Sequence, residues 1–186
     1  MLRIVEELPH HVTAREALLD AAFGVERHGK TCERLREGRL PANGLALAVL
    51  DGETLVGTLR FWHVATGDGR PALMLGPLAV ADSHRACGIG GKLMRRGLTL
   101  AGAYGHRSVL LVGDEPYYRR FGFARTLAAP LDLPGWYAAE RFLALELQPG
   151  ALDGARGMVV ATGRHEGALP FTAADAGEDL VEGDRA

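Results

Sequence analysis

The sequence predicts an α+β fold in three layers, with a mixed, mostly antiparallel central sheet between flanking helices. Two apolar runs, 45–50 and 54–66, are separated by Asp51-Gly52, a dipeptide typical of tight hairpin turns. Further along, two apolar runs enclose a helical pattern, which is the order of a strand–helix–strand crossover. These later segments are the strands 73–80 and 108–112 and the helix 90–104. Antiparallel strands followed by one such crossover are the plan of an α+β fold.

The elements before the first hairpin are predicted from local signals. Residues 2–5 form a short apolar run that is typical of a strand. Thr13 is followed by Glu16 three residues later, the spacing of a capping box, so we expect a helix to begin there. A second short helix is expected over 31–37, ended by Gly38. The inward face of the first helix is expected to carry Ala17, Leu18, Ala21, Ala22 and Phe23.

The central helix and the later segments follow from hydrophobic periodicity. Apolar residues recur at helical spacing between 90 and 104. The next apolar run, 108–112, is expected to be buried on both faces and parallel to 73–80. Residues 116–121 suggest one or two helical turns. Later strands are expected at 141–147 and 157–162.

Length and composition indicate one folded domain with a tail. The chain has 186 residues, of which 47% are apolar, enough for a core of ordinary size. Residues 170–186 hold five acidic residues and one arginine, a net charge of -4, and little apolar mass. We therefore expect a single domain over 1–169 and an acidic, disordered tail over 170–186.

Composition also argues against several classes of protein. A net charge of -2 without a basic stripe disfavours nucleic-acid binding. No apolar run reaches the ~18 residues of a membrane span, and the start of the chain lacks the apolar core of a signal peptide. Cys32 and Cys87 are too few for a disulfide framework or a zinc site. We expect a cytoplasmic protein with no metal, no membrane partner and no nucleic-acid partner.

The most informative stretch is a glycine-rich turn, residues 85–91, between the strand 73–80 and the central helix. Glycines let the backbone approach a ligand closely, and the first amides of a helix have no intrahelical acceptor. Arg85 adds a charged fork that suits phosphate oxygens. The turn therefore predicts a pyrophosphate site at the helix N-terminus.

Two other phosphate-binding patterns do not fit these residues. A dinucleotide site needs Gly-x-Gly-x-x-Gly, but Gly88 and Gly90 are followed by Leu93 where the third glycine would stand. A Walker-type loop needs a hydroxyl after Gly-Lys, and Leu93 follows Lys92 here.

The sequence resembles the GNAT superfamily of acetyl-CoA-dependent N-acyltransferases. The central signature of that family, Arg/Gln-x-x-Gly-x-Gly/Ala after a strand, is matched by Arg85, Gly88 and Gly90. A second block, an aromatic–Tyr pair shortly before Gly-Phe, is matched across residues 117–123. An apolar strand lies between the two blocks, as the family's order requires. The resemblance covers residues 45–123.

The resemblance implies an N-acetyltransferase that moves an acetyl group from acetyl-CoA, as co-substrate, directly to a primary amine. It implies that Tyr118 protonates the leaving thiolate, with Tyr117 as the alternate; tyrosine suits this role because its pKa exceeds that of a thiol by only ~1.5 units. It also implies that a backbone amide near the end of the strand polarises the thioester. The implied cofactor-binding residues are Leu78, Ala79, Val80, Arg85, Ala86, Cys87, Gly88, Ile89, Gly90 and Gly91.

The sequence leaves the general base and the acceptor open. Many members of the family carry a glutamate on the strand before the turn, but residues 73–81 contain no acid. The nearby candidates are His63, Asp82, His84 and Glu115, and a chain of water molecules is a further option. The acceptor is a primary amine of a small molecule or of a peptide. Residues 130–137 either line the acceptor cleft, pack against a partner or cap the core.

Two alternatives concern the molecule as a whole. A protein of the same fold could bind acyl-CoA with weak catalysis or none, as a sensor or an interaction module. An exposed strand edge near 141–147 would also allow a homodimer.

Overall fold

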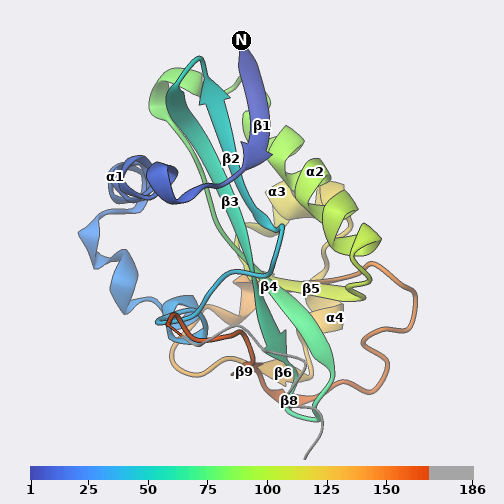
Figure 1. Cartoon of the computed structure of the whole chain (residues 1–186). Helices are drawn as coiled ribbons and strands as arrows, with labels where there is room; N and C mark the ends of the chain where they lie inside the picture. Colours follow the sequence, from blue (N-terminus) through green and yellow to red (C-terminus); the bar gives the residue numbers. More distant parts are fainter. Residues whose placement is uncertain (168–186) are drawn as a thin grey trace, which may run out of the picture.

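The computed structural model describes residues 1–167, which contain a seven-stranded sheet with helices on both faces (Figure 1). The strand order is β1-β2-β3-β4-β5-β7, and β9 pairs with β3. Within this sheet only β4 and β5 are parallel, and α2 connects them. The predicted α+β fold, mostly antiparallel with one central crossover, is therefore confirmed.

The strands are β1 (Leu2–Glu6), β2 (Ala46–Asp51), β3 (Thr54–Ala65), β4 (Pro71–Val80), β5 (Ser108–Val112), β6 (Leu131–Asp132), β7 (Phe142–Glu146), β8 (Gly157–Met158) and β9 (Val160–Ala161). The helices are α1 (Val12–Phe23), α2 (Ile89–Ala103), α3 (Glu115–Tyr118) and α4 (Arg125–Ala128). Turns of 3-10 helix cover Pro9–His11, Val25–Gly29, Thr31–Leu35, Asp82–His84, Arg119–Phe121 and Ala139–Arg141. The short strands β6 and β8 form a second, two-stranded sheet.

Helix α2 packs on one face of the sheet as its periodicity predicts. Leu93, Met94 and Ala101 are fully buried in the larger core cluster. The helix approaches β3 closely at Gly97, where an added Cβ would lie 2.7 Å from the ring of Phe61. A residue without a side chain at this position therefore allows the helix to lie directly against the sheet.

Helix α1 covers the other face, but its details differ from the prediction (Figure 1). It begins at Val12, and no side chain caps it, because the carboxylate of Glu16 bonds to arginines instead of the helix end. Its buried residues are Arg15 and Leu19, not the predicted apolar face. Arg15 is buried because Glu7, at the end of β1, neutralises it. Of the predicted face, Ala17, Ala21 and Phe23 are exposed and Leu18 and Ala22 are partly buried.

Four other expectations either need correction or concern residues outside the described range. The segment 31–37 contains a 3-10 turn rather than an α-helix, and 157–162 holds two strands of two residues each. The edge of β7 is met by Ala124, which exchanges backbone hydrogen bonds of 2.9 and 3.0 Å with Ala144. Residues 168–169 of the predicted domain and the predicted tail, 170–186, lie outside the described residues. Within 1–167 no helix has the length and apolar character needed to cross a membrane.

Candidate active site

The sheet opens between β4 and β5. These two parallel strands pair at only two positions, Leu73 with Val109 and Met74 with Leu110. Beyond them β4 carries a bulge at Gly76-Pro77, where the register with β3 shifts. The indole N–H of Trp62 on β3 donates to the carbonyl oxygen of Gly76 at 2.6 Å, and proline has no N–H for a neighbouring strand. The second half of β4 therefore pairs on one side only.

The alternation of backbone groups along β4 decides which amides face the opening. The amide of Ala81 donates to Val56 on β3 at 2.9 Å. Successive backbone groups of a strand point to opposite sides, so the amide of Ala79 also faces β3. The amides of Leu78 and Val80 consequently face the opened side. Two backbone amides, those of Leu78 and Val80, thus lie along the opening without a strand partner. The resemblance implied a polarising backbone amide in this part of the strand.

The glycine-rich turn presents a row of amides at the N-terminus of α2. Ala86 and Gly88 are left-handed, with φ of 64° and 72°, and Gly88 is the N-cap residue. The first helical hydrogen bond runs from the amide of Lys92 to the carbonyl oxygen of Gly88 at 3.0 Å. Among residues 1–167 the amides of 86–91 have no acceptor, and residues 85–88 are exposed. This geometry suits an anionic group that accepts several hydrogen bonds.

Arg85 stands at the start of this turn with its side chain 62% exposed. Its guanidinium lies 2.9 Å from the carboxylate of Asp82. An exposed ion pair of this kind contributes little stability. The guanidinium of Arg85 can therefore release the carboxylate of Asp82 and bind a phosphate in its place. Cys87 is exposed in the same turn.

Tyr118 lies at the base of the opening. It follows β5 on the short helix α3, whose N-cap residue is Asp114. Burial, together with the neighbouring Tyr117 and Asp114, raises the pKa of Tyr118 to about 12. The ring of Tyr118 packs directly against the backbone of residue 113. Only glycine fits there, because a Cβ on Gly113 would lie 2.2 Å from the ring. The fold thus holds Tyr118 as a protonated phenol beside the end of β5.

Tyr117 connects this helix to the glycine-rich turn. Its hydroxyl would lie 2.9 Å from a Cβ at Gly90, so Tyr117 packs against the first turn of α2. The guanidinium of Arg120 lies 4.4 Å from the centre of the Tyr117 ring. Burial raises the pKa of Tyr117, although the two nearby arginines, Arg120 and Arg95, oppose the shift. The structure brings both predicted tyrosines to the opening.

A cleft of about 670 Å³ lies over the opening, within the size range of small-molecule sites. Its floor includes Leu78 from β4, Gly113 after β5 and both tyrosines. Its walls come from two segments that lie far apart in sequence, 23–36 and 136–141. Residues 136 and 137 of the loop 130–137 line this cleft, and Tyr137 also packs on Phe142, with ring centroids 5.6 Å apart. The wall residues are Phe23, Arg27, Gly29, Lys30, Thr31, Cys32, Arg34, Arg36, Trp136, Tyr137, Ala138 and Arg141.

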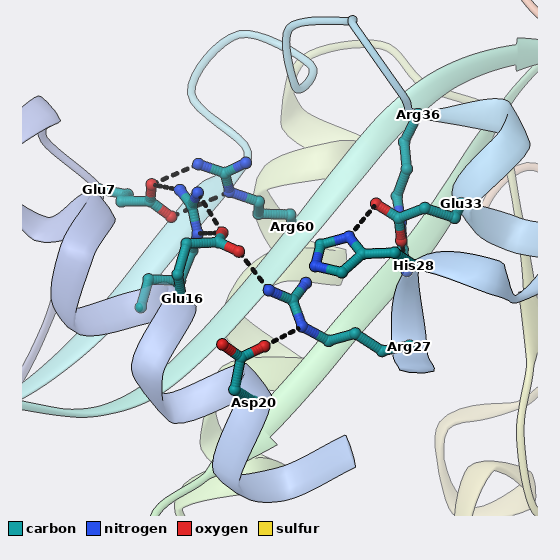
Figure 2. Close-up of polar contacts among 9 residues, drawn as sticks. Glu7, Glu16, Asp20, Arg27, His28, Glu33, Arg36 and Arg60 are labelled. Carbon is teal, nitrogen blue, oxygen red and sulfur yellow. Dashed lines mark hydrogen bonds and ion pairs between the residues drawn. The ribbon is translucent and has the colours of Figure 1, made fainter. Parts of the chain in front are cut away.

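An ionic network built around the buried Arg15 and Arg27 holds the first wall in place (Figure 2). Arg27 bonds to Asp20 and Glu16 of α1, and Glu16 in turn bonds to Arg15. Glu7 lies between the guanidinium groups of Arg15 and Arg60. The network therefore links the end of β1, the helix α1, strand β3 and the 3-10 turn Val25–Gly29.

The two glutamates of this network respond differently to their surroundings. Burial would raise the pKa of Glu16, but the hydrogen bonds from Arg15 and Arg27 outweigh it, and the pKa lies below its ordinary value. Burial dominates at Glu7 and raises its pKa despite the nearby Arg15. Glu16 is therefore the carboxylate whose charge the fold favours.

The four candidate bases from the sequence lie away from the cleft lining. His63 lies against His106, with ring centroids 5.3 Å apart, and His84 lies 3.4 Å from Asp51. Asp82 is paired with Arg85, as described above. Glu115 lines a neighbouring pocket of about 510 Å³. Among the described residues no three His, Cys, Asp or Glu side chains gather as metal ligands would.

Asp114 is the carboxylate that lines the cleft, and Arg141 lies 3.2 Å from it. The sequence did not single out Asp114 or the basic wall residues. These charges are isolated in sequence, and they meet only because the segment 23–36 folds over the ends of β4 and β5.

Comparison with known proteins supports the resemblance found in the sequence. The chain matches the model of the Acetyltransferase (GNAT) family over residues 13–123. It is 32% identical to the N-acetyltransferase YhbS of Escherichia coli K12 over 158 aligned residues. The alignment covers 82% of this chain and 92% of that protein.

Solved structures show the same likeness. The Escherichia coli YhbS structure, a complex with CoA, superposes with a TM-score of 0.73 at 28% identity, over 87% of this chain and 89% of that one. A GNAT-family acetyltransferase from Brucella melitensis, in complex with acetyl-CoA, gives a TM-score of 0.62 at 25% identity, over 94% and 98%. The chain therefore belongs to the GNAT family of acetyltransferases.

Proposed function

We propose that this enzyme binds acetyl-CoA and transfers its acetyl group directly to a primary amine. The observation that carries the proposal is the row of six amides, 86–91, without acceptors among the described residues, beside an opened edge of β4. A pyrophosphate bound at the turn would leave the pantetheine arm to follow the free amides of Leu78 and Val80 towards the cleft.

Polarisation of the thioester carbonyl and protonation of the leaving thiolate each have a group of the protein to meet them. The amide of Leu78 or Val80 donates a hydrogen bond to the thioester carbonyl oxygen and stabilises the negative charge that develops there. Burial raises the pKa of Tyr118 to about 12, which keeps it protonated but makes it a weaker acid than a free tyrosine. Tyr118 donates a hydrogen bond to the leaving thiolate and transfers its proton as the CoA thiol forms. Attack by the amine is direct, so no nucleophilic side chain is required.

The amine must lose its proton before it attacks. The one carboxylate of the described cleft lining, Asp114, is engaged in an ion pair with Arg141. The cleft is open to solvent at its walls, where Trp136 is 86% exposed. Proton release to water at the cleft mouth accounts for deprotonation without a dedicated basic side chain.

The proposal is tested by incubating the protein with acetyl-CoA and a panel of primary amines. Release of the CoA thiol and mass spectrometry of the acetylated amine give two independent readouts. Amine-dependent thiol release with a matching product is expected. Binding of acetyl-CoA without product from any amine would instead favour the alternative, an acyl-CoA-binding sensor of the same fold. Failure to bind acetyl-CoA would contradict both.

A further inference from the structure

The wall that faces the opening is strongly basic. Five cationic side chains line the cleft, against the single carboxylate of Asp114 among the described lining residues. They are Arg27, Lys30, Arg34, Arg36 and Arg141. A cleft built to receive a polycationic amine would be expected to carry the opposite charge.

Neighbouring carboxylates neutralise three of these five cations. The guanidinium of Arg36 lies 2.7 Å from Glu33. Arg27 is enclosed by the network of Figure 2. The pairs are Arg27 with Glu16 and Asp20, Arg36 with Glu33, and Arg141 with Asp114.

Lys30 and Arg34 have no carboxylate partner within residues 1–167. The ammonium of Lys30 lies 5.2 Å from the centre of the Phe23 ring. Arg34 uses Nη1 for a hydrogen bond of 3.3 Å to the carbonyl oxygen of Pro134, which leaves the edge of Nε and Nη2 free. Two positive charges, one of them on a planar fork, are thus presented at the cleft without a counter-charge.

The opposite wall is held against these cations. The hydroxyl of Thr31 donates to the carbonyl oxygen of Trp136, and Gly135 is so close to Arg34 that an added Cβ would lie 3.2 Å from Nη1. The two walls therefore form a built site rather than two loose loops. Trp136 and Tyr137 supply apolar surface beside the charges.

We propose that the acceptor is a small primary amine that also carries a carboxylate, that is, an amino acid in the broad sense. Arg34 and Lys30 bind the carboxylate, and the amine points towards the opening of the sheet. A guanidinium edge fits a carboxylate with two parallel hydrogen bonds. The same charges disfavour polyamines and aminoglycosides by repulsion. This inference rests on the acyl-transfer function proposed above and specifies its substrate.

Acceptor pairs that differ only by the carboxylate test the inference. Suitable pairs are phenylalanine with phenethylamine, lysine with cadaverine, and 6-aminohexanoate with pentylamine. With acetyl-CoA as donor, we expect kcat/KM to be at least tenfold higher for the carboxylate member of the pair that turns over fastest. Equal or higher kcat/KM for the decarboxylated amine would overturn the proposal.

Variants assign the effect to the two cations. Arg34→Gln and Lys30→Gln are each expected to reduce the preference about tenfold, through KM, while Arg34→Lys keeps part of it. Arg3→Gln removes an exposed arginine of β1, outside the cleft lining, and should leave the preference unchanged. A preference that persists in the Arg34→Gln, Lys30→Gln double variant would contradict the assignment.

Product binding keeps the inference separate from the proposed function. The CoA-bound protein is titrated with N-acetylphenylalanine and 6-acetamidohexanoate, and binding at least tenfold weaker in the double variant is expected. If acetyl-CoA binds and an amine is acetylated but neither carboxylate product binds, the anionic acceptor is wrong and the proposed acetyl transfer stands. If acetyl-CoA does not bind, both fail.

Discussion

At the scale of single residues, the site depends on Tyr118 being held as a protonated phenol. Its raised pKa means that the acid form persists below about pH 12, so ionisation of this group cannot lower the rate near neutrality. We expect Tyr118→Phe to lower kcat about 100-fold, a typical contribution of a general acid, with little change in acetyl-CoA affinity. Wild-type kcat should not fall between pH 8 and 10.

Tyr117→Phe is the control for this prediction. Tyr117 was the alternate acid, and it packs on the glycine-rich turn. We expect Tyr117→Phe to lower kcat less than Tyr118→Phe does. If instead Tyr117→Phe produces the large loss and Tyr118→Phe does not, the roles of the two tyrosines must be exchanged.

Gly113 is the second residue on which the site depends. Because a Cβ there would lie 2.2 Å from the Tyr118 ring, Gly113→Ala must displace that ring. We expect kcat to fall in Gly113→Ala to a level close to that of Tyr118→Phe, and the double variant to be hardly worse than either. Steady-state kinetics of the three variants measure this, and additive losses would show that Gly113 acts elsewhere.

At the scale of elements, the closeness of α2 to the sheet can be tested with two glycines of the same helix. A Cβ at Gly97 would lie 2.7 Å from the Phe61 ring, whereas nothing lies within 4 Å of one at Gly102. Gly97→Ala should lower the free energy of unfolding by about 1–3 kcal/mol through overpacking. Gly102→Ala should leave it unchanged or raise it by up to about 1 kcal/mol, because alanine favours helix. Denaturant unfolding compares them, and equal effects would contradict the packing described.

Elements with a strong hydrophobic periodicity could be predicted from the sequence. Elements whose buried face depends on ion pairs could not. The hairpin at Asp51-Gly52 and the helix over 90–104 are confirmed, because burial of an apolar face follows directly from the pattern. For α1 the pattern was misleading, since the buried positions include Arg15, whose partner Glu7 lies eight residues away, between β1 and the first 3-10 turn. Only tertiary structure determines such a pair.

At the scale of the whole molecule, the ionic network connects stability to pH. The pKa of Glu16 is lowered in the fold, so its contribution is present above its unfolded pKa and is lost as the pH falls through the folded value. We expect Glu16→Gln to lower the free energy of unfolding at pH 7 by about 1–2 kcal/mol, less than for a fully buried pair because the side chain is 38% exposed.

The difference between wild type and Glu16→Gln should shrink as the pH falls from 5 towards 3. Glu7 is present in both proteins, but it shares Arg15 with Glu16 and the charge of Glu16 helps to raise its pKa, so the difference includes this coupling. Urea unfolding at several pH values measures the difference. A difference that stays constant across this range would show that Glu16 does not carry a lowered pKa.

The parts of the site differ in how far they follow from sequence. The glycine-rich turn and Tyr118 are local motifs. Tyr118 lines the cleft, whereas residues 85–91 lie outside its lining and adjoin it through Tyr117, which packs on Gly90. The basic wall was not predicted, because Lys30 and Arg34 become significant only when the fold sets them apart from every described carboxylate. Spatial position, rather than residue type, distinguishes them from other surface charges.

The most direct test of the account is calorimetric titration with acetyl-CoA. Wild type is compared with an Arg85→Ala, Gly88→Ala, Gly90→Ala variant, and Gly102→Ala serves as a matched control on the same helix. We expect saturable binding by wild type and Gly102→Ala, and a loss of at least 100-fold in affinity for the loop variant with its circular dichroism unchanged. Unchanged affinity in the folded loop variant, or no binding by wild type, would contradict the assignment of residues 85–91 as the pyrophosphate site.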